Sequence, residues 1–290
     1  MLTIFAMTEK GLAFTELAIS RFKDLISLVV IGQDDAVDDD FSSRIAEACQ
    51  KSSTNFCFRH EHTHIESEYA IAISWRWMIK HPSDKLIVFH DSLLPRYRGF
   101  APLVNALING EPAVGVTALF GASEYDRGDI IHQASSAIEY PITIASAIST
   151  INKCYIECGE AVMTALARGA GLTAVPQDHS KATYSLWRDE QDYRLDWSLP
   201  ASTLRRTIDA LSSPYRGALC QINGVPARIL AAEEVDDVII ENRTPGKVIF
   251  VEEGLPTIVC ASGLLKILKC ISDETSQDML PLTRFRSRFT

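Results

Sequence analysis

A histidine, two arginines and a glycine stand close together in the run His90-Asp91-Ser92-Leu93-Leu94-Pro95-Arg96-Tyr97-Arg98-Gly99. Histidine can act as acid or base near neutral pH, and arginine can hold an anion through its several N–H donors. Gly99 permits a turn. The run follows the apolar segment 86–90 and precedes a helix-like segment. We therefore expect it at the carboxyl end of a strand, where open α/β sheets bind ligands.

A second polar run, Glu124-Tyr125-Asp126-Arg127-Gly128-Asp129-Ile130, follows the apolar segment 114–120. Carboxylates in a glycine-containing loop can orient a histidine, position a substrate amine or bind a metal. The spacing alone leaves all three roles open.

Short apolar runs alternate with helix-period segments from residue 2 to residue 168, and this predicts a Rossmann-like, mostly parallel α/β sheet with helices on both faces. Strands are expected at 2–6, 26–31, 69–74, 86–90, 114–120 and 130–138, and helices at 9–21, 44–51, 102–109 and 142–168. Residues 34–40 are acidic and loop-like.

A Gly/Pro/polar stretch at 171–181 is interpreted as a linker. Beyond it, a helix is expected at 201–211, followed by short β runs at 227–230, 248–251, 257–260 and 264–268. Turn signals separate these runs, which is typical of a small β barrel or sandwich. The predicted domains are residues 1–182 and 183–290.

The composition is that of a globular protein, with 47% apolar and 22% charged residues. The 28 basic and 37 acidic residues give a net charge of −9, which disfavours non-specific nucleic-acid binding. We expect no membrane segment, because no stretch approaches ~20 apolar residues. We also expect no signal peptide, because the N-terminus lacks a basic segment and a long apolar core. The seven cysteines, an odd count without a CxxC pair, indicate a reduced, cytoplasmic protein with cysteines mostly in the core.

Two charged patterns have more than one interpretation. His60, His62 and His64 alternate and would share one face of a strand, as metal ligands do, but a polar connection is the favoured interpretation and no metal is predicted. The arginines at 284, 286 and 288 suit a nucleic-acid strip, although an edge strand with one charged face is commoner.

Four motifs together resemble the formyltransferase family, whose members use 10-formyltetrahydrofolate: the run from His90, the helix end Asn109-Gly110-Glu111, the strand Gly115-Val116-Thr117 and the loop Asp126-x-Gly128. The specific resemblance covers residues 69–140. A looser one covers 183–270, where Trp187-Arg188, Asp196-Trp197-Ser198 and Gly246 fall as in the family's C-terminal OB-like domain.

The resemblance implies a mechanism in which a neutral amine attacks the formyl carbon. A histidine kept charged by an aspartate stabilises the oxyanion or shuttles a proton, and His90 and Asp126 match these positions. The family also has an asparagine two residues before the histidine, which donates a second hydrogen bond to the developing charge. This chain has Val88 there, which has no side-chain donor.

The resemblance also implies the binding residues. Expected to line the formyl-donor pocket are Trp75, Arg76, Trp77, Met78, Glu124, Tyr125 and Asp129. Expected to bind the acceptor are Ser92, Leu93, Leu94, Pro95, Arg96, Tyr97, Arg98, Gly99 and Asn105. Either Trp75 or Trp77 suits stacking on the pterin, and their alternation predicts that the two rings face opposite ways.

A nucleotide-linked amino sugar is the leading acceptor hypothesis, because the chain is acidic and lacks an evident basic loop. In addition, the run Ser74-Trp75-Arg76-Trp77 resembles the sugar enzymes of the family at this place. Methionyl-tRNA formyltransferase is the alternative that would make nucleic acid a partner. A non-catalytic binding protein, suggested by Val88, and hydrolysis of the formyl donor are further alternatives. No membrane partner is expected, and a homodimer fits the resemblance.

Overall fold

The computed structural model describes residues 1–34, 39–62, 64–169 and 171–290, and these form two compact units. The first unit comprises Met1–Leu103, Ala113–Ala137 and Ile148–Leu186, and the second comprises Val104–Pro112, Ile138–Ala147 and Trp187–Thr290. The last crossing between the units thus falls at 186/187, near the predicted boundary at 182/183. The assignment of 104–112 and 138–147 to the second unit was not predicted. Part of the predicted acidic loop at 34–40 lies outside the described residues.

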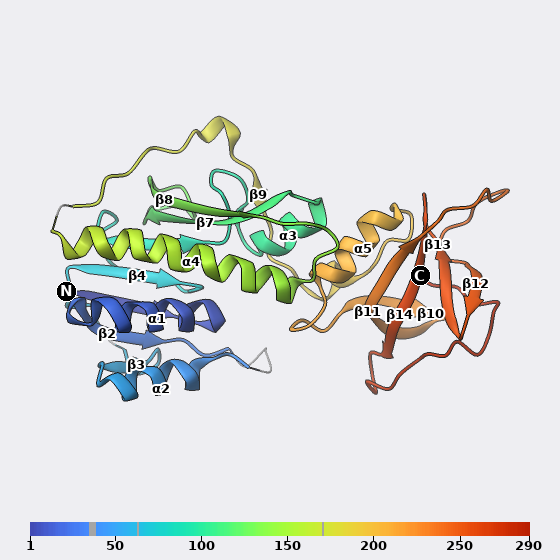
Figure 1. Ribbon diagram of the computed structural model, residues 1–290, viewed down its shortest axis with the longest axis horizontal. Coiled ribbons are helices and arrows are strands. Elements are labelled where there is room, and N and C mark those ends of the chain that lie inside the picture. The colour runs from blue at the N-terminus through green and yellow to red at the C-terminus, as the bar shows by residue number, and fades with distance from the viewer. Residues whose placement is uncertain (35–38, 63, 170) are drawn as a thin grey trace. The chain divides into compact units, whose positions relative to one another are not determined.

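One seven-stranded sheet forms the centre of the first unit, with the order β3-β2-β1-β4-β5-β7-β8 (Figure 1). Its strands are β1 (Leu2–Ala6), β2 (Ile26–Ile31), β3 (Phe56–Phe58), β4 (Tyr69–Ile73), β5 (Leu86–His90), β7 (Ala113–Phe120) and β8 (Ile130–Ala137). The first five strands in this order are parallel, and β7 and β8 are added antiparallel. The predicted mostly parallel α/β sheet is confirmed. The three-residue strand β3 is too short to give a periodic signal and was missed.

Helices α1 (Thr8–Phe22), α2 (Ser42–Ser52) and α4 (Ile144–Ala167) pack on one face of this sheet. Phe14 of α1 and Tyr155 of α4 both contact the ring of Phe89, at centroid distances of 5.2 and 5.8 Å. A Cβ on Gly159 would lie 2.9 Å from the Phe14 ring, so the glycine allows α4 to approach α1 closely. These contacts tie both helices to the central strand β5.

The opposite face is covered by non-helical segments, which corrects the expectation of helices on both faces. Phe5 lies on this face, and Trp75 packs edge-on against it at 5.0 Å. Ile65 and Ile79, from the connections before and after β4, complete this cluster. Both connections lack a helical period, since one is rich in histidine and the other contains proline. Their described residues form turns and irregular segments and no helix.

A five-stranded antiparallel sheet with the order β10-β11-β14-β13-β12 dominates the second unit. The strands of this sheet are β10 (Ala218–Ile222), β11 (Val225–Val235), β12 (Val248–Glu252), β13 (Leu255–Val259) and β14 (Leu264–Ser272). The second unit also contains helix α5 (Ala201–Ala210) and the part of helix α3 (Pro102–Asn109) that begins at Val104. Helix α5 packs on β11 and β14. The predicted β-rich second domain is confirmed, although β10 was missed.

Short elements complete the chain. Strands β6 (Arg98–Gly99) and β9 (Tyr184–Ser185) form a parallel pair, and 3-10 helices occur at Lys23–Leu25, His179–Lys181 and Glu190–Tyr193. Near the C-terminus, Phe289 is buried against Trp197. The three alternating arginines at 284, 286 and 288 are exposed.

All seven cysteines are free, and six of them are buried. Burial raises the pKa of Cys49 to about 11 and that of Cys158 to about 12, so these thiols stay protonated at neutral pH. Among the described residues, no helix combines the length and the apolar character that crossing a bilayer requires.

The Phe14→Ala variant tests the packing of α1 and α4 on β5. Phe14 is fully buried, and its loss leaves a cavity between Phe89 and Gly159. We expect the free energy of unfolding to fall by about 3–5 kcal/mol, measured by urea denaturation. Phe100→Ala, at a ring that is 46% exposed, is the matched control and should change stability by less than about 1 kcal/mol. Equal losses in both variants would contradict this account of the core.

Candidate active site

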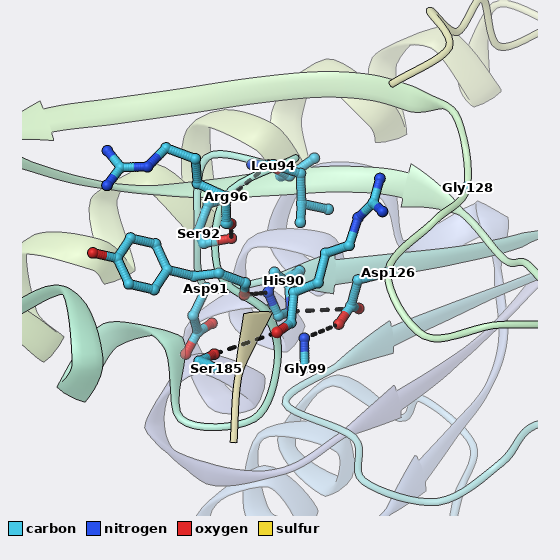
Figure 2. A network of polar contacts seen from close by, with 12 residues as sticks. His90, Asp91, Ser92, Leu94, Arg96, Gly99, Asp126, Gly128 and Ser185 are labelled. Atoms are coloured by element: carbon cyan, nitrogen blue, oxygen red, sulfur yellow. Dashed lines mark hydrogen bonds and ion pairs between the residues drawn. The ribbon is translucent and has the colours of Figure 1, made fainter. Parts of the chain in front are cut away.

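His90 is the last residue of β5 and is 8% exposed. Its Nε2 lies 2.7 Å from the backbone carbonyl oxygen of Tyr97, and its Nδ1 lies 3.4 Å from Oδ1 of Asp126 (Figure 2). Both ring nitrogens therefore face acceptor oxygens, and a doubly protonated imidazolium can donate toward both. The contact with Tyr97 fixes the ring and leaves the Nδ1–Asp126 side for chemistry.

Asp126 reaches His90 from the loop between β7 and β8, and its side chain is 12% exposed. The carboxylate Oδ2 accepts a hydrogen bond of 2.8 Å from the backbone N–H of Gly99 (Figure 2). The backbone of Asp126 is left-handed, with a φ of 55°, which is unfavourable for a residue other than glycine. The predicted pairing of His90 with Asp126 is thus present, and surrounding contacts must hold the loop.

Gly128 shows how tightly this loop is packed. A Cβ at this position would lie 1.8 Å from the carbonyl oxygen of Phe120, at the end of β7. Only glycine lets the loop return so close to the strand that it has just left.

The segment after His90 folds back on itself. The hydroxyl of Ser92 donates to the carbonyl oxygen of Arg96 at 2.7 Å, and Ser92 and Leu94 are buried. Thr117 of β7 lies opposite His90, donates to the carbonyl oxygen of Ser92 and accepts from the N–H of Leu94. These side chains therefore shape the loop around His90.

Arg98 corrects the expectation of an anion-binding arginine at that position. Its side chain is 1% exposed, and its guanidinium donates to Gln177 Oε1 and His179 Nδ1 within the first unit. A side chain engaged in this way cannot bind an anion arriving from solvent. Arg96, by contrast, is exposed.

Gln177 is a residue of the site that the sequence did not indicate. It is 6% exposed, and its Nε2 donates to the carbonyl oxygens of Asp126 at 2.8 Å and of Gly128 at 2.7 Å. The preceding Val175 pairs with Ile130 through two backbone hydrogen bonds of 2.8 Å. The stretch interpreted as a linker thus runs along the start of β8, and nothing in a single Gly/Pro/polar sequence signals this.

A buried charge cluster lies next to His90. Lys10 of α1 forms an ion pair with Asp91, and the hydroxyl of Tyr155 donates to the same carboxylate. Burial acts to raise the pKa of Asp91, but the Lys10 ammonium and the two hydrogen bonds outweigh it, and the pKa is lowered. Burial and the neighbouring Asp91 raise the pKa of Tyr155 well above its ordinary value. Sequence reasoning missed this cluster, because its members come from three distant segments.

Val88 lies on the same face of β5 as His90, because alternate residues of a strand share a face. Val88 is half-buried and pairs in register with Ala72 and Leu119. The departure from the family pattern therefore falls at the site itself.

The expected formyl-donor residues after β4 form an aromatic and cationic group. The rings of Trp75 and Trp77 contact each other at 5.0 Å, so the prediction that they face opposite ways is wrong. Strand β4 ends at Ile73 and Ser74 has a φ of 51°, so strand alternation does not continue. Arg76 forms an ion pair of 2.9 Å with Asp34, and Met78 is 72% exposed.

The other predicted residues have varied surroundings. Tyr125 is 64% exposed beside Phe100, Glu124 forms an ion pair with Arg127, and Asp129 is exposed. Asn105, in the second unit, accepts a hydrogen bond of 2.7 Å from Arg188.

The alternating histidines have separate partners. His60 stacks on Phe58, His62 contacts Phe5 edge-on, and His64 lies 2.9 Å from Glu66. Within the described ranges, no group of three or more His, Cys, Asp or Glu side chains is placed to hold a metal ion.

The Asp91→Asn variant tests the buried charge cluster. Because the pKa of Asp91 is lowered in the folded state, its contribution to stability is present above the ordinary aspartate pKa near 3.8 and is lost as the pH falls through the folded value. At pH 7 the variant removes the carboxylate charge that faces the largely buried Lys10 ammonium, so we expect a loss of about 3 kcal/mol. Urea denaturation at pH 7 and pH 3 should show this difference and its reduction at the lower pH. Asp84→Asn, on an exposed turn, is the control. A loss that is the same at both pH values would contradict the assignment.

Comparisons with known proteins agree with this geometry. Residues 66–158 match the family model described as formyl transferase, and residues 188–282 match its C-terminal domain. The chain is 34% identical over 180 residues to methionyl-tRNA formyltransferase of Fervidobacterium nodosum, covering 61% of this chain and 56% of that protein. It is 31% identical over 217 residues to the same enzyme of Syntrophomonas wolfei, covering 73% and 66%. The matches thus span about half to two thirds of these relatives' length.

Two solved structures share the fold. The N-formyltransferase of Helicobacter canadensis, in complex with folinic acid and dTDP-3-aminofucose, superimposes with a TM-score of 0.72 at 17% identity, covering 96% of this chain and 98% of that one. HypX of Aquifex aeolicus gives a TM-score of 0.63 at 19% identity, covering 94% and 46%. With two matched domains, named relatives and this shared fold, the chain belongs to the folate-dependent formyltransferase family.

Proposed function

We propose that this protein transfers a formyl group from 10-formyltetrahydrofolate to a primary amine, with His90 and Asp126 as its catalytic residues. The observation that carries the proposal is the buried His90–Asp126 pair, with 3.4 Å between Nδ1 and Oδ1, at a strand end of a formyltransferase domain. A buried acid–base pair of this kind suits proton transfer near neutral pH.

The reaction exchanges one carbon–nitrogen bond for another. The amine nitrogen forms a bond to the formyl carbon, and the bond from that carbon to N10 of the folate breaks. The amine loses one proton and N10 gains one, so the step is neutral in protons overall. Since Nε2 of His90 donates to the Tyr97 carbonyl, the neutral ring has its free lone pair at Nδ1, and we assign to Nδ1 the transfer of the amine proton to N10, with Asp126 beside it.

We propose that the formyl donor binds near Trp75, Arg76, Trp77, Met78, Glu124, Tyr125 and Asp129. The exposure of Met78 and Tyr125 supports their availability to a ligand. The proposed acceptor-binding residues are Ser92, Leu93, Leu94, Pro95, Arg96, Tyr97 and Gly99, of which Arg96 offers an exposed cation to an anionic acceptor.

For the acceptor we propose a nucleotide-linked amino sugar. The net charge of −9 supports this choice over a polyanionic RNA, because such binding rests on basic surfaces. The Helicobacter canadensis enzyme named above, bound to such a sugar, shares its fold with 96% of this chain at 17% identity. The second candidate is methionyl-tRNA, because the curated relatives at 31–34% identity carry that name.

The first test is formylation by the purified protein. It is incubated with 10-formyltetrahydrofolate and either a panel of nucleotide-linked amino sugars or methionyl initiator tRNA, and products are identified by mass spectrometry. We expect a formylated sugar, and we expect His90→Ala and Asp126→Asn to lower kcat by about 10²–10⁴-fold. His132→Ala, on β8, is the matched control. Formyl-methionyl-tRNA without a formyl sugar would replace the sugar hypothesis, and no product with either acceptor would contradict the proposed function.

The Val88→Asn variant tests whether the family's second hydrogen-bond donor is useful in this site. One such donor is worth about 10²–10³ in rate where it contacts the developing oxyanion. Val88 is half-buried on the His90 face, so an amide fits there without full loss of hydration. We expect kcat to rise by about tenfold or more, whereas Val88→Ala, which adds no donor, should not raise it. An unchanged or lower kcat with the asparagine would mean that another group already donates to the oxyanion.

A further inference from the structure

The catalytic loop that carries Asp126 depends on one amide side chain. Gln177 donates from Nε2 to the carbonyl oxygens of Asp126 and Gly128, and accepts at Oε1 from Nε and Nη2 of Arg98 at 3.1 and 2.6 Å. Two donors and two acceptor positions are all that a glutamine offers, so its hydrogen-bonding capacity is fully used. Gln177 and Arg98 are 6% and 1% exposed, and water therefore cannot readily replace these bonds.

The contacts close a ring through the site. Arg98 holds Gln177, Gln177 holds the backbone of Asp126, and the Asp126 carboxylate accepts from the N–H of Gly99, the neighbour of Arg98. The same carboxylate faces His90. The ring thus joins the histidine run to the aspartate loop through a third segment, far from both in sequence.

Asp126 needs such support, because its left-handed backbone, with a φ of 55°, is not favoured locally. The hydrogen bond to its carbonyl oxygen restrains the peptide that follows it, and the bond to Gly128 restrains the same loop two residues later. Without the two donors, two carbonyl oxygens lose their buried partner and the loop can relax. A displacement of about 1 Å at a catalytic group can cost about 10²-fold in rate.

We propose that Gln177 is a positioning residue, which fixes the Asp126 carboxylate beside Nδ1 of His90 through its hydrogen bonds to the loop backbone. The role in catalysis rests on the proposed function. The role in holding the loop does not, and can be tested without activity.

Two substitutions separate positioning from simple stabilisation. Gln177→Leu removes all four hydrogen bonds. Gln177→Glu keeps the acceptor oxygens and, when ionised at pH 8, forms an ion pair with Arg98, but it has no N–H to donate to the loop. If Gln177 served only to satisfy Arg98, the glutamate would rescue the protein. If it positions Asp126, the ion pair with Arg98 restores only part of the Tm that Gln177→Leu loses, and kcat stays low.

The experiment measures three quantities for each variant: Tm, kcat for formyl transfer, and hydrogen exchange at the amide of Gly99, which donates to Asp126 Oδ2. We expect Gln177→Glu to recover part of the Tm that Gln177→Leu loses, to lose about 10–10²-fold in kcat and to speed exchange at Gly99 at least tenfold. Asn152→Leu is the control, because it removes an amide that joins α4 to Glu9 of α1, away from the loop.

Unchanged exchange at Gly99 in both Gln177 variants would overturn the proposal, as would full kcat in Gln177→Glu. If the unmodified protein shows no formyl transfer, the proposed function fails, but faster exchange at Gly99 in Gln177→Glu still supports the positioning of the loop. The two failures are therefore distinguishable.

Discussion

The site depends on keeping a carboxylate beside a histidine where both are largely shielded from water. Asp126 and His90 come from opposite ends of an antiparallel strand pair and are 12% and 8% exposed. A charge in such surroundings is tolerated only when partners compensate for lost hydration. The Gly99 amide, the Tyr97 carbonyl and the Gln177 amide provide hydrogen bonds to this pair or its backbone. Much of the surrounding loop structure follows from this requirement.

The two faces of the central sheet divide the work of folding and function. Phe89 faces α1 and α4 and anchors β5 in an apolar layer, with the Lys10–Asp91–Tyr155 cluster at the strand end. His90 and Val88 point to the other face, where the described residues of the connections before and after β4 form no helix. Because helices pack tightly on one face of β5, the strand has little freedom to move. A side chain on its other face is therefore held in a fixed position, as a preorganised site requires.

Local sequence signals located most of the fold, and the resemblance to a known family pointed to His90 and Asp126. Local signals failed where contacts are long-range. The strands 2–6, 26–31 and 86–90 agree residue for residue, because continuous apolar runs mark buried parallel strands. Gln177 lies in a stretch with the composition of a linker. Its hydrogen bonds are made with residues that are distant in the sequence, so a local pattern cannot indicate them. Arg98 looked like a ligand-binding cation, but sequence cannot tell a buried guanidinium from an exposed one. Helices were predicted on both faces of the first unit's sheet because alternating strands and helices usually imply a helix in each connection. The connections before and after β4 contain no helix in their described residues, and the alternation alone does not reveal this.

Val88 reduces the number of side chains in this site that can donate a hydrogen bond to a reacting group. An apolar side chain at that position gives no hydrogen bond to a developing oxyanion, while every contact described around His90 and Asp126 restrains the groups that handle the proton. In the proposed formyl transfer, stabilisation of the transition state would then rest mainly on the His90–Asp126 pair. A single pair with this burden tolerates little positional error, since its electrostatic benefit falls with distance. This is a physical reason for a glycine-only turn at Gly128 and for the ring of bonds through Gln177, in a loop whose local conformation is unfavourable.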